Sequence, residues 1–96
     1  MLTLASFAPL LGAAFVLHVD AGAPLPLHLV EAGVLGCPGD AVRTPFSLLF
    51  EGPAQPLLAQ ATYALAHPAL GPEPMPVFLV PVARSAAGVR YEAVFN

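Results

Sequence analysis

The sequence contains no lysine, no isoleucine and no tryptophan, and it has a single cysteine and few charged residues. Three arginines (Arg43, Arg84 and Arg90) stand against six carboxylates, and the formal net charge is −3. Proteins that bind nucleic acid neutralise runs of phosphates with clustered basic side chains. The scarcity of basic residues therefore argues against nucleic-acid binding. Cys37 alone cannot form an internal disulfide, so nothing in the sequence requires an oxidising compartment.

The chain has an excess of apolar residues. Hydrophobic residues make up 57% of its 96 residues and charged residues 9%, whereas about 25% of residues in globular proteins are charged. This composition excludes an intrinsically disordered chain, and the length predicts a single domain over residues 1–96. Because so few ionised groups must keep the folded surface dissolved, we expect apolar patches that are covered by a protein partner or by further copies of the chain.

The first nineteen residues carry no charge and are followed by small residues, which resembles a secretory signal. A signal peptide begins with basic residues, however, and the first basic residue here is Arg43. Pro9 and Gly12 also interrupt the apolar run, which is marginal in length for a bilayer. We therefore expect cytoplasmic synthesis and no membrane span.

Twelve prolines and eight glycines divide the chain into apolar runs of about strand length. Ser6 is expected to cap a short helical turn over residues 7–11, within a lead-in of residues 1–13. Six segments in which alternate residues share an apolar face are predicted strands: 14–19, 27–32, 44–51, 60–66, 77–82 and 90–96. Their short connections favour antiparallel neighbours. The sequence thus predicts an all-β fold, a small six-stranded, mainly antiparallel barrel or a compact sandwich with a short N-terminal helical turn.

Histidines and the cysteine are the candidate metal ligands. If Leu17 lies opposite Leu29, then His18 lies opposite His28 on the outer face, close enough to share an ion. A third ligand would have to be Cys37 or Asp20, and neither has a recognised spacing. The favoured interpretation is therefore two partly solvated strand residues and no metal site. A small binding module for an apolar ligand or a metal ion near His18 and His28 remains the alternative.

No set of residues indicates catalysis. The six carboxylates are spread along the chain, Ser47 lies in the middle of a predicted strand, and no glycine-rich phosphate motif occurs. Cys37 lies in a Gly-Cys-Pro-Gly loop and is more typical of a small apolar residue than of a reactive thiol. We expect no enzymatic activity and no cofactor.

Several predicted strands are apolar on both faces, although a small barrel has only one interior. The outward apolar positions are Val16, Val30, Leu49, Val80, Val82 and Val94, and together with Pro81 and Phe95 on the same strands they predict an interface. Pro81 lacks a backbone donor and restricts its strand to a sheet edge or a bulge. Either this strand or the one at 90–96 is expected to offer an edge for strand addition by a partner.

Several segments carry a family resemblance: PFSLLFEGP at 45–53, QATY at 60–63, FLVPV at 78–82 and YEAVFN at 91–96. These segments resemble a family of small bacterial proteins that is described as a domain of unknown function. Genes of that family often lie beside those of phage-tail-collar, microcystin-dependent-protein-like fibre proteins. The resemblance implies a role in building or capping a fibre, within the cell or as part of a cell-surface or secreted assembly. With the residues above, it predicts a non-enzymatic assembly protein that docks a larger protein through apolar strand faces or edge-strand pairing.

Overall fold

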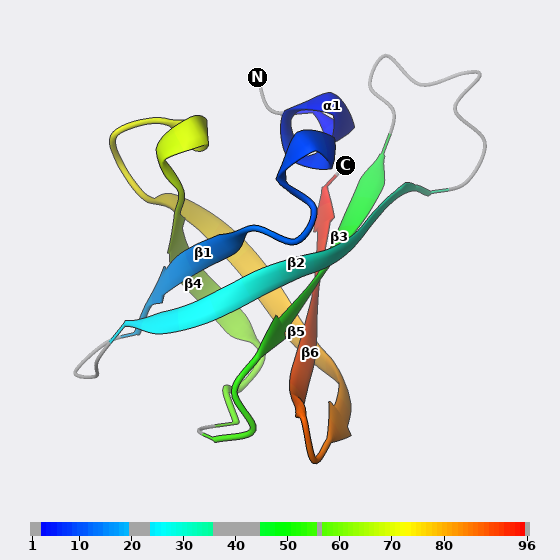
Figure 1. Ribbon diagram of the computed structural model, residues 1–96, viewed down its shortest axis with the longest axis vertical. Helices are drawn as coiled ribbons and strands as arrows, with labels where there is room; N and C mark the ends of the chain where they lie inside the picture. The colour runs from blue at the N-terminus through cyan, green and yellow to red at the C-terminus, as the bar shows by residue number, and fades with distance from the viewer. Residues whose placement is uncertain (1–2, 20–23, 36–44, 56, 96) are drawn as a thin grey trace.

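Six antiparallel strands form a closed barrel with a short helical segment at one end (Figure 1). The computed structural model describes residues 3–19, 24–35, 45–55 and 57–95. Within them the strands are β1 (Ala14–His18), β2 (Leu25–Val34), β3 (Phe46–Gly52), β4 (Ala61–Ala66), β5 (Met75–Ser85) and β6 (Gly88–Phe95). All six predicted strands are confirmed, and the barrel is one of the two predicted architectures.

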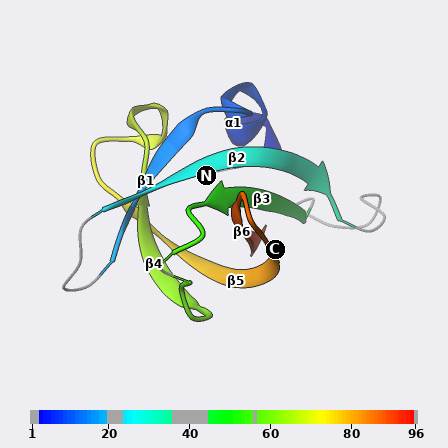
Figure 2. The same ribbon diagram turned by 60° about the horizontal axis from the view of Figure 1, so that its bottom comes forward.

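The strand order around the barrel is β1-β2-β3-β6-β5-β4, and it closes where β1 meets β4. That closing contact is short, with three residue pairs from Val16↔Ala66 to His18↔Ala64. The two longest strands, β2 and β5, curve around the barrel (Figure 2). Each pairs with β1 or β4 only near its N-terminal end, so its C-terminal half has a single neighbouring strand.

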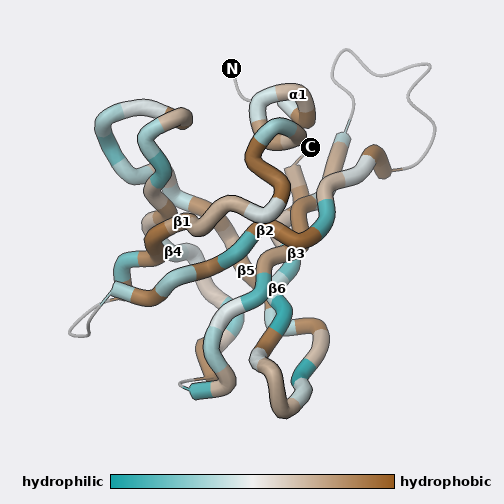
Figure 3. Tube along the Cα trace, in the orientation of Figure 1, coloured by the Kyte–Doolittle hydropathy of each residue, from teal (hydrophilic) through white to brown (hydrophobic). Residues whose placement is uncertain are grey.

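The core consists of inward side chains from all six strands together with Phe7 and Leu58, which lie outside the strands. Figure 3 shows apolar and polar positions interleaved along the strands. Tyr91 is buried in this core, and its hydroxyl oxygen accepts a hydrogen bond from the Leu58 backbone N–H at 3.0 Å. The buried set is Phe7, Phe15, Leu17, Leu27, Leu29, Phe46, Leu48, Phe50, Leu58, Leu65, Val77, Leu79, Val89, Tyr91 and Ala93.

The helical segment covers the end of the barrel where β6 terminates (Figure 1). It consists of α1 (Leu4–Phe7) and the 3-10 turn η1 (Ala8–Leu10), and a second 3-10 turn, η3 (Pro68–Leu70), joins β4 to β5. Capping by Ser6 was predicted for a helix at 7–11, but the helix begins earlier, and Thr3 is its N-cap. The Ser6 hydroxyl instead accepts a hydrogen bond from the Thr3 N–H at 3.1 Å.

Three aromatic rings close this end of the barrel. Phe46 and Phe95 are cross-strand partners whose rings stack at 4.8 Å and 4°, and Phe7 lies 5.9 Å and 5.6 Å from them. Phe95 was predicted to be an interface residue, but its ring contributes to this cluster. Phe95 lies on the same side of its strand as the buried Tyr91 and Ala93, and its partner Phe46 faces the core.

Of the two predicted edges, the one at β6 is wrong for residues 89–92, whereas residues 80–85 of β5 have β6 as their one neighbouring strand among the described residues. β6 pairs with β3 from Phe95 to Val89 and with β5 from Glu92 to Gly88, so both its sides are hydrogen-bonded. The second alternative for Pro81 is confirmed, because the β5–β6 register shifts between Pro81 and Ala83. Pro81 lies opposite the buried Tyr91, on the inner side of the sheet, and is not part of an outer face.

A second register shift occurs in β2. Leu29 pairs with Phe50 and Glu31 with Leu49, so Val30 is an extra residue opposite β3. A bulge of this kind lets two consecutive residues line the same side of a sheet. Val30 and Glu31 both line a groove on the outside of the barrel, which the strict alternation would not allow.

Candidate functional site

Five of the eight predicted interface residues lie on one continuous part of the barrel exterior. Leu49 on β3 and Val94 on β6 are close neighbours, because Val94 pairs with Ser47. Val80 on β5 lies opposite Glu92 of β6, and Val82 follows at the β5 bulge. We call Leu49, Val80, Val82 and Val94 the outer apolar face. Val30, the fifth residue, lies beside it on β2.

The exposure of this face differs from one residue to the next. Val82 and Val94 are each about half exposed, at 50% and 49%, whereas Leu49 and Val80 are partly covered by their neighbours. Val16 is also exposed, but it pairs with Pro26 of β2 and Ala66 of β4. It therefore lies on the β1 side of the barrel and outside this face.

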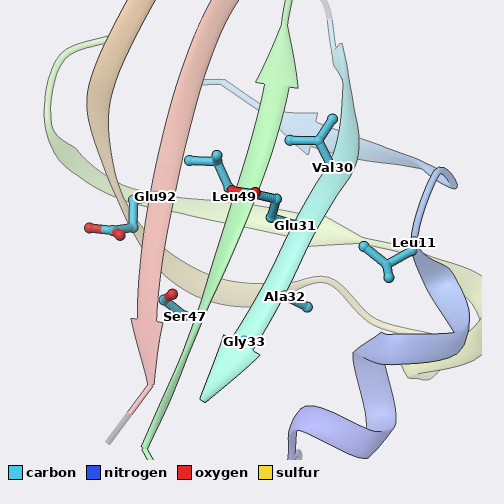
Figure 4. Close-up of a pocket in the computed structure, with 8 residues that line it drawn as sticks. All are labelled: Leu11, Val30, Glu31, Ala32, Gly33, Ser47, Leu49 and Glu92. Carbon is cyan, nitrogen blue, oxygen red and sulfur yellow. The ribbon is translucent and has the colours of Figure 1, made fainter. Parts of the chain in front are cut away.

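A groove adjoins the outer apolar face where β2, β3 and β6 run side by side (Figure 4). Its volume is about 440 Å³. Leu11, which follows η1, bounds it at the free side of β2. We call it the acidic groove, and its lining residues are Leu11, Val30, Glu31, Ala32, Gly33, Ser47, Leu49 and Glu92.

The two carboxylates of this groove flank an apolar side chain. Glu31, Leu49 and Glu92 are successive partners across β2, β3 and β6, and Val80 continues the same row on β5. Figure 4 shows Leu49 with Glu31 on one side and Glu92 on the other. Glu92 is thus enclosed by Leu49, Val80 and, two residues along its own strand, Val94.

Among the described residues, neither of these two carboxylates takes part in an ion pair. The one ion pair found there joins Arg90 Nε to Glu51 Oε2 at 3.3 Å, between cross-strand partners on β6 and β3. The outer surface of β2, β3 and β6 therefore carries Glu31, Glu51 and Glu92 against Arg90 alone, and it has a net negative charge.

The predicted histidine pair is not formed. His28 lies opposite Ala14, and Leu17 lies opposite Leu25 and not opposite Leu29. His18 is therefore displaced from His28 by four residues along the hairpin, roughly 13 Å. Cys37 and Asp20, the proposed third ligands, lie outside the described residues. Among those that are described, no three histidine, cysteine or acidic side chains are grouped closely enough to hold a metal ion.

His67 and Tyr63 make local hydrogen bonds. His67 Nδ1 accepts from the Ala69 N–H at 3.0 Å and shapes the turn at η3. The Tyr63 hydroxyl donates to the Ala59 carbonyl at 2.6 Å. Burial raises the pKa of this phenol above its ordinary value, and the neighbouring Tyr91 adds to the rise. Neither group lies in the acidic groove.

Sequence reasoning placed Val30 and Leu49 in the site but missed Leu11, Glu31 and Glu92. Alternation along residues 90–96 already placed Glu92 on the same side as Val94. The outward position of Glu31 depends on the bulge at Val30, and that of Leu11 on the turn after η1. Neither has a sequence signal of its own.

Comparison with known proteins agrees with the resemblance described above. In the part of the chain that the structure describes, no helix is long and apolar enough to cross a membrane. No curated protein and no solved structure matches the chain. Residues 2–95 match the family described as Domain of unknown function (DUF6916). The chain therefore belongs to this family of domains of unknown function.

Proposed function

We propose that this chain is a non-enzymatic assembly protein that docks a larger protein through its outer apolar face. The observation that carries the proposal is the position of Leu49, Val80, Val82 and Val94 outside the barrel, on three adjacent strands. The core is already complete without them, because every strand has its own inward set. Contiguous exposed apolar side chains on a small protein mark a binding surface.

The route of docking that we favour is contact through a strand face. Strand addition was expected at β5 or at β6; β6 is paired on both sides over residues 89–92, whereas residues 80–85 of β5 have β6 as their one neighbouring strand among the described residues. A face contact does not depend on either edge. A face contact uses side chains that point outward from the sheet and leaves the barrel's hydrogen bonds intact. It also explains why the half-exposed Val82 and Val94 are valines, in a sheet that could carry threonine at these positions.

The partner that we propose is a fibre-forming protein of the phage-tail-collar type. Support for this comes from the family resemblance, which associates such genes with this family in bacteria. The docked chain would then help to build or cap a phage-tail-like or bacterial surface fibre. In this role the chain needs no cofactor and no catalytic group.

The proposal is tested by capture of the partner with variants of the outer apolar face. Purification at native expression level with mass spectrometry identifies the partner, and binding is then measured between the two purified proteins. Val80→Asp with Val94→Asp is expected to abolish binding, because two carboxylates would have to lose water against apolar groups. Val16→Asp is the matched control on the β1 side and is expected to bind normally.

Folding of each variant is checked by its melting temperature and circular dichroism before binding is compared. A folded double variant that binds the partner as tightly as the parent chain would reject the outer apolar face as the docking surface.

A further inference from the structure

We infer that the acidic groove receives a basic and apolar protein segment, in which an arginine or lysine stands close to an apolar side chain. This inference rests on the proposed function, because the groove adjoins the outer apolar face and shares Leu49 with it. It adds the chemistry of the partner, which the apolar residues alone do not specify.

Glu92 is the main reason for this choice. Its cross-strand neighbours on both sides are apolar, Leu49 on β3 and Val80 on β5. Any protein that covers these residues also removes water from the Glu92 carboxylate. A buried charge is costly unless an opposite charge and hydrogen bonds compensate it. A partner that fits this surface must therefore supply a cation at Glu92.

Among the described residues of β2, β3 and β6, no free cation is present to supply this charge. Arg90 is already paired with Glu51 at 3.3 Å, and Glu31 adds a further carboxylate on the other side of Leu49. A second copy of the chain, docked face to face, would bring the same excess of carboxylates against this one. The charge of the face thus favours a different, basic partner over self-association.

The spacing of the site describes the segment more closely. Glu31 and Glu92 are two strands apart, roughly 10 Å at the usual distance between strands, with Leu49 between them. In an extended segment, alternate side chains point the same way and lie about 7 Å apart. An apolar residue seated on Leu49, Val30 and Leu11 would thus place cations two residues before and after it within reach of both carboxylates.

A terminally blocked peptide with the sequence Gly-Arg-Ser-Leu-Ser-Arg-Gly is the probe, and the same peptide with glutamate for both arginines is its control. Binding is measured by NMR titration of the folded, full-length chain at low ionic strength. The basic peptide is expected to shift the amide signals of Val30, Leu49 and Glu92, and the acidic peptide is expected to leave them unchanged.

Two variants separate a local effect from one of net charge. Glu31→Gln with Glu92→Gln is expected to weaken the binding of the basic peptide by about tenfold, which corresponds to about 1.4 kcal/mol. Glu73→Gln also removes a negative charge, but Glu73 lies in the loop before β5. The affinity of this variant for the basic peptide should therefore stay within about twofold of that of the parent chain.

Several results would overturn the inference: no binding of the basic peptide, equal binding of the acidic peptide, or an equal loss in Glu73→Gln. Self-association by sedimentation that Glu92→Gln leaves unchanged would also overturn it, in favour of a second copy. The proposed function has a separate outcome. If Val80→Asp with Val94→Asp abolishes partner binding while the peptide fails to bind, the docking face stands and only the basic chemistry is rejected.

Discussion

Single residues decide how closely the strands of this barrel approach one another. Gly88 begins β6 at a φ of 157°, and a Cβ there would collide with the carbonyl oxygen of Gly52. A backbone atom cannot move aside as a side chain can. Gly33 on β2 has open space around its missing Cβ and no positive φ. The two glycines therefore have different reasons to be in the chain.

Gly88→Ala is expected to lower the free energy of unfolding by about 1–3 kcal/mol, because the strands must separate to accommodate the methyl group. Gly33→Ala is the control and should be neutral or stabilising by up to about 1 kcal/mol, since alanine restricts the unfolded chain. Urea denaturation of both variants measures the difference. Equal stability of the two variants would show that the close contact between β3 and β6 at Gly88 does not require glycine.

Tyr63 makes the stability of the folded chain depend on pH in the alkaline range. Its pKa is raised in the folded protein by burial and by Tyr91, so the unfolded chain loses this proton at a lower pH than the folded chain. Stability from this group is complete below about pH 10 and is lost as the pH rises through the folded pKa.

Tyr63→Phe is therefore expected to lose less stability than the parent chain between about pH 8 and about pH 11. At the lower pH the variant should already be slightly less stable, because the hydrogen bond to the Ala59 carbonyl is absent. Urea denaturation at both pH values provides the comparison. Parallel losses in the two proteins would contradict the effect attributed to Tyr63.

At the scale of elements, the short helix depends on the barrel that it covers. A four-residue helix has no stability of its own in water. Phe7 is fully buried against the stacked rings of Phe46 and Phe95, and it is the one buried residue in α1. Its side chain therefore fixes the helix to the barrel end and completes the aromatic cluster there.

Phe7→Ala is expected to lower the free energy of unfolding by about 3–5 kcal/mol and to expose the amides of α1 to hydrogen exchange. Leu57→Ala, at a side chain that is 49% exposed, is the matched control and should cost much less. If Phe7→Ala lowered the free energy of unfolding no more than Leu57→Ala does, the packing of α1 against the barrel would not contribute to the stability of the fold.

Elements were easier to predict from the sequence than the contacts between them. Alternation located all six strands and their inward residues, since each strand has one buried face. Alternation could not fix the register of β1 and β2. Leu25 and Leu29 are an even number of residues apart and face the same side of the sheet, so either could lie opposite Leu17. The pairing of His18 with His28 failed for this reason, although both histidines lie on the expected outer face.

At the scale of the whole molecule, the sequence predicted a barrel or a compact sandwich, and the contact that closes the barrel decides between the two. The short contact between β1 and β4 removes the free edge that an open sheet would have, and no local pattern announces it. The two bulges were equally hidden, apart from the hint that Pro81 provides. Composition was informative at this scale, because the shortage of charge predicted apolar residues outside the core, where Val82 and Val94 lie.

The same shortage predicts how the isolated chain behaves as its charge is removed. The net charge of −3 keeps copies apart near neutral pH, and it approaches zero near the pI of about 5.3. Copies of the chain can then approach one another without a repulsion between net charges. We expect sedimentation velocity to show monomers at about pH 8 and larger species near the pI.

Neutral variants identify the surface that is responsible, because they leave the pI unchanged. Val80→Ser with Val94→Ser is expected to reduce the association near the pI, while Val16→Ser on the β1 side should not. An equal response of the two variants would mean that association spreads over the whole barrel. A selective response would show that copies of the chain associate through the outer apolar face.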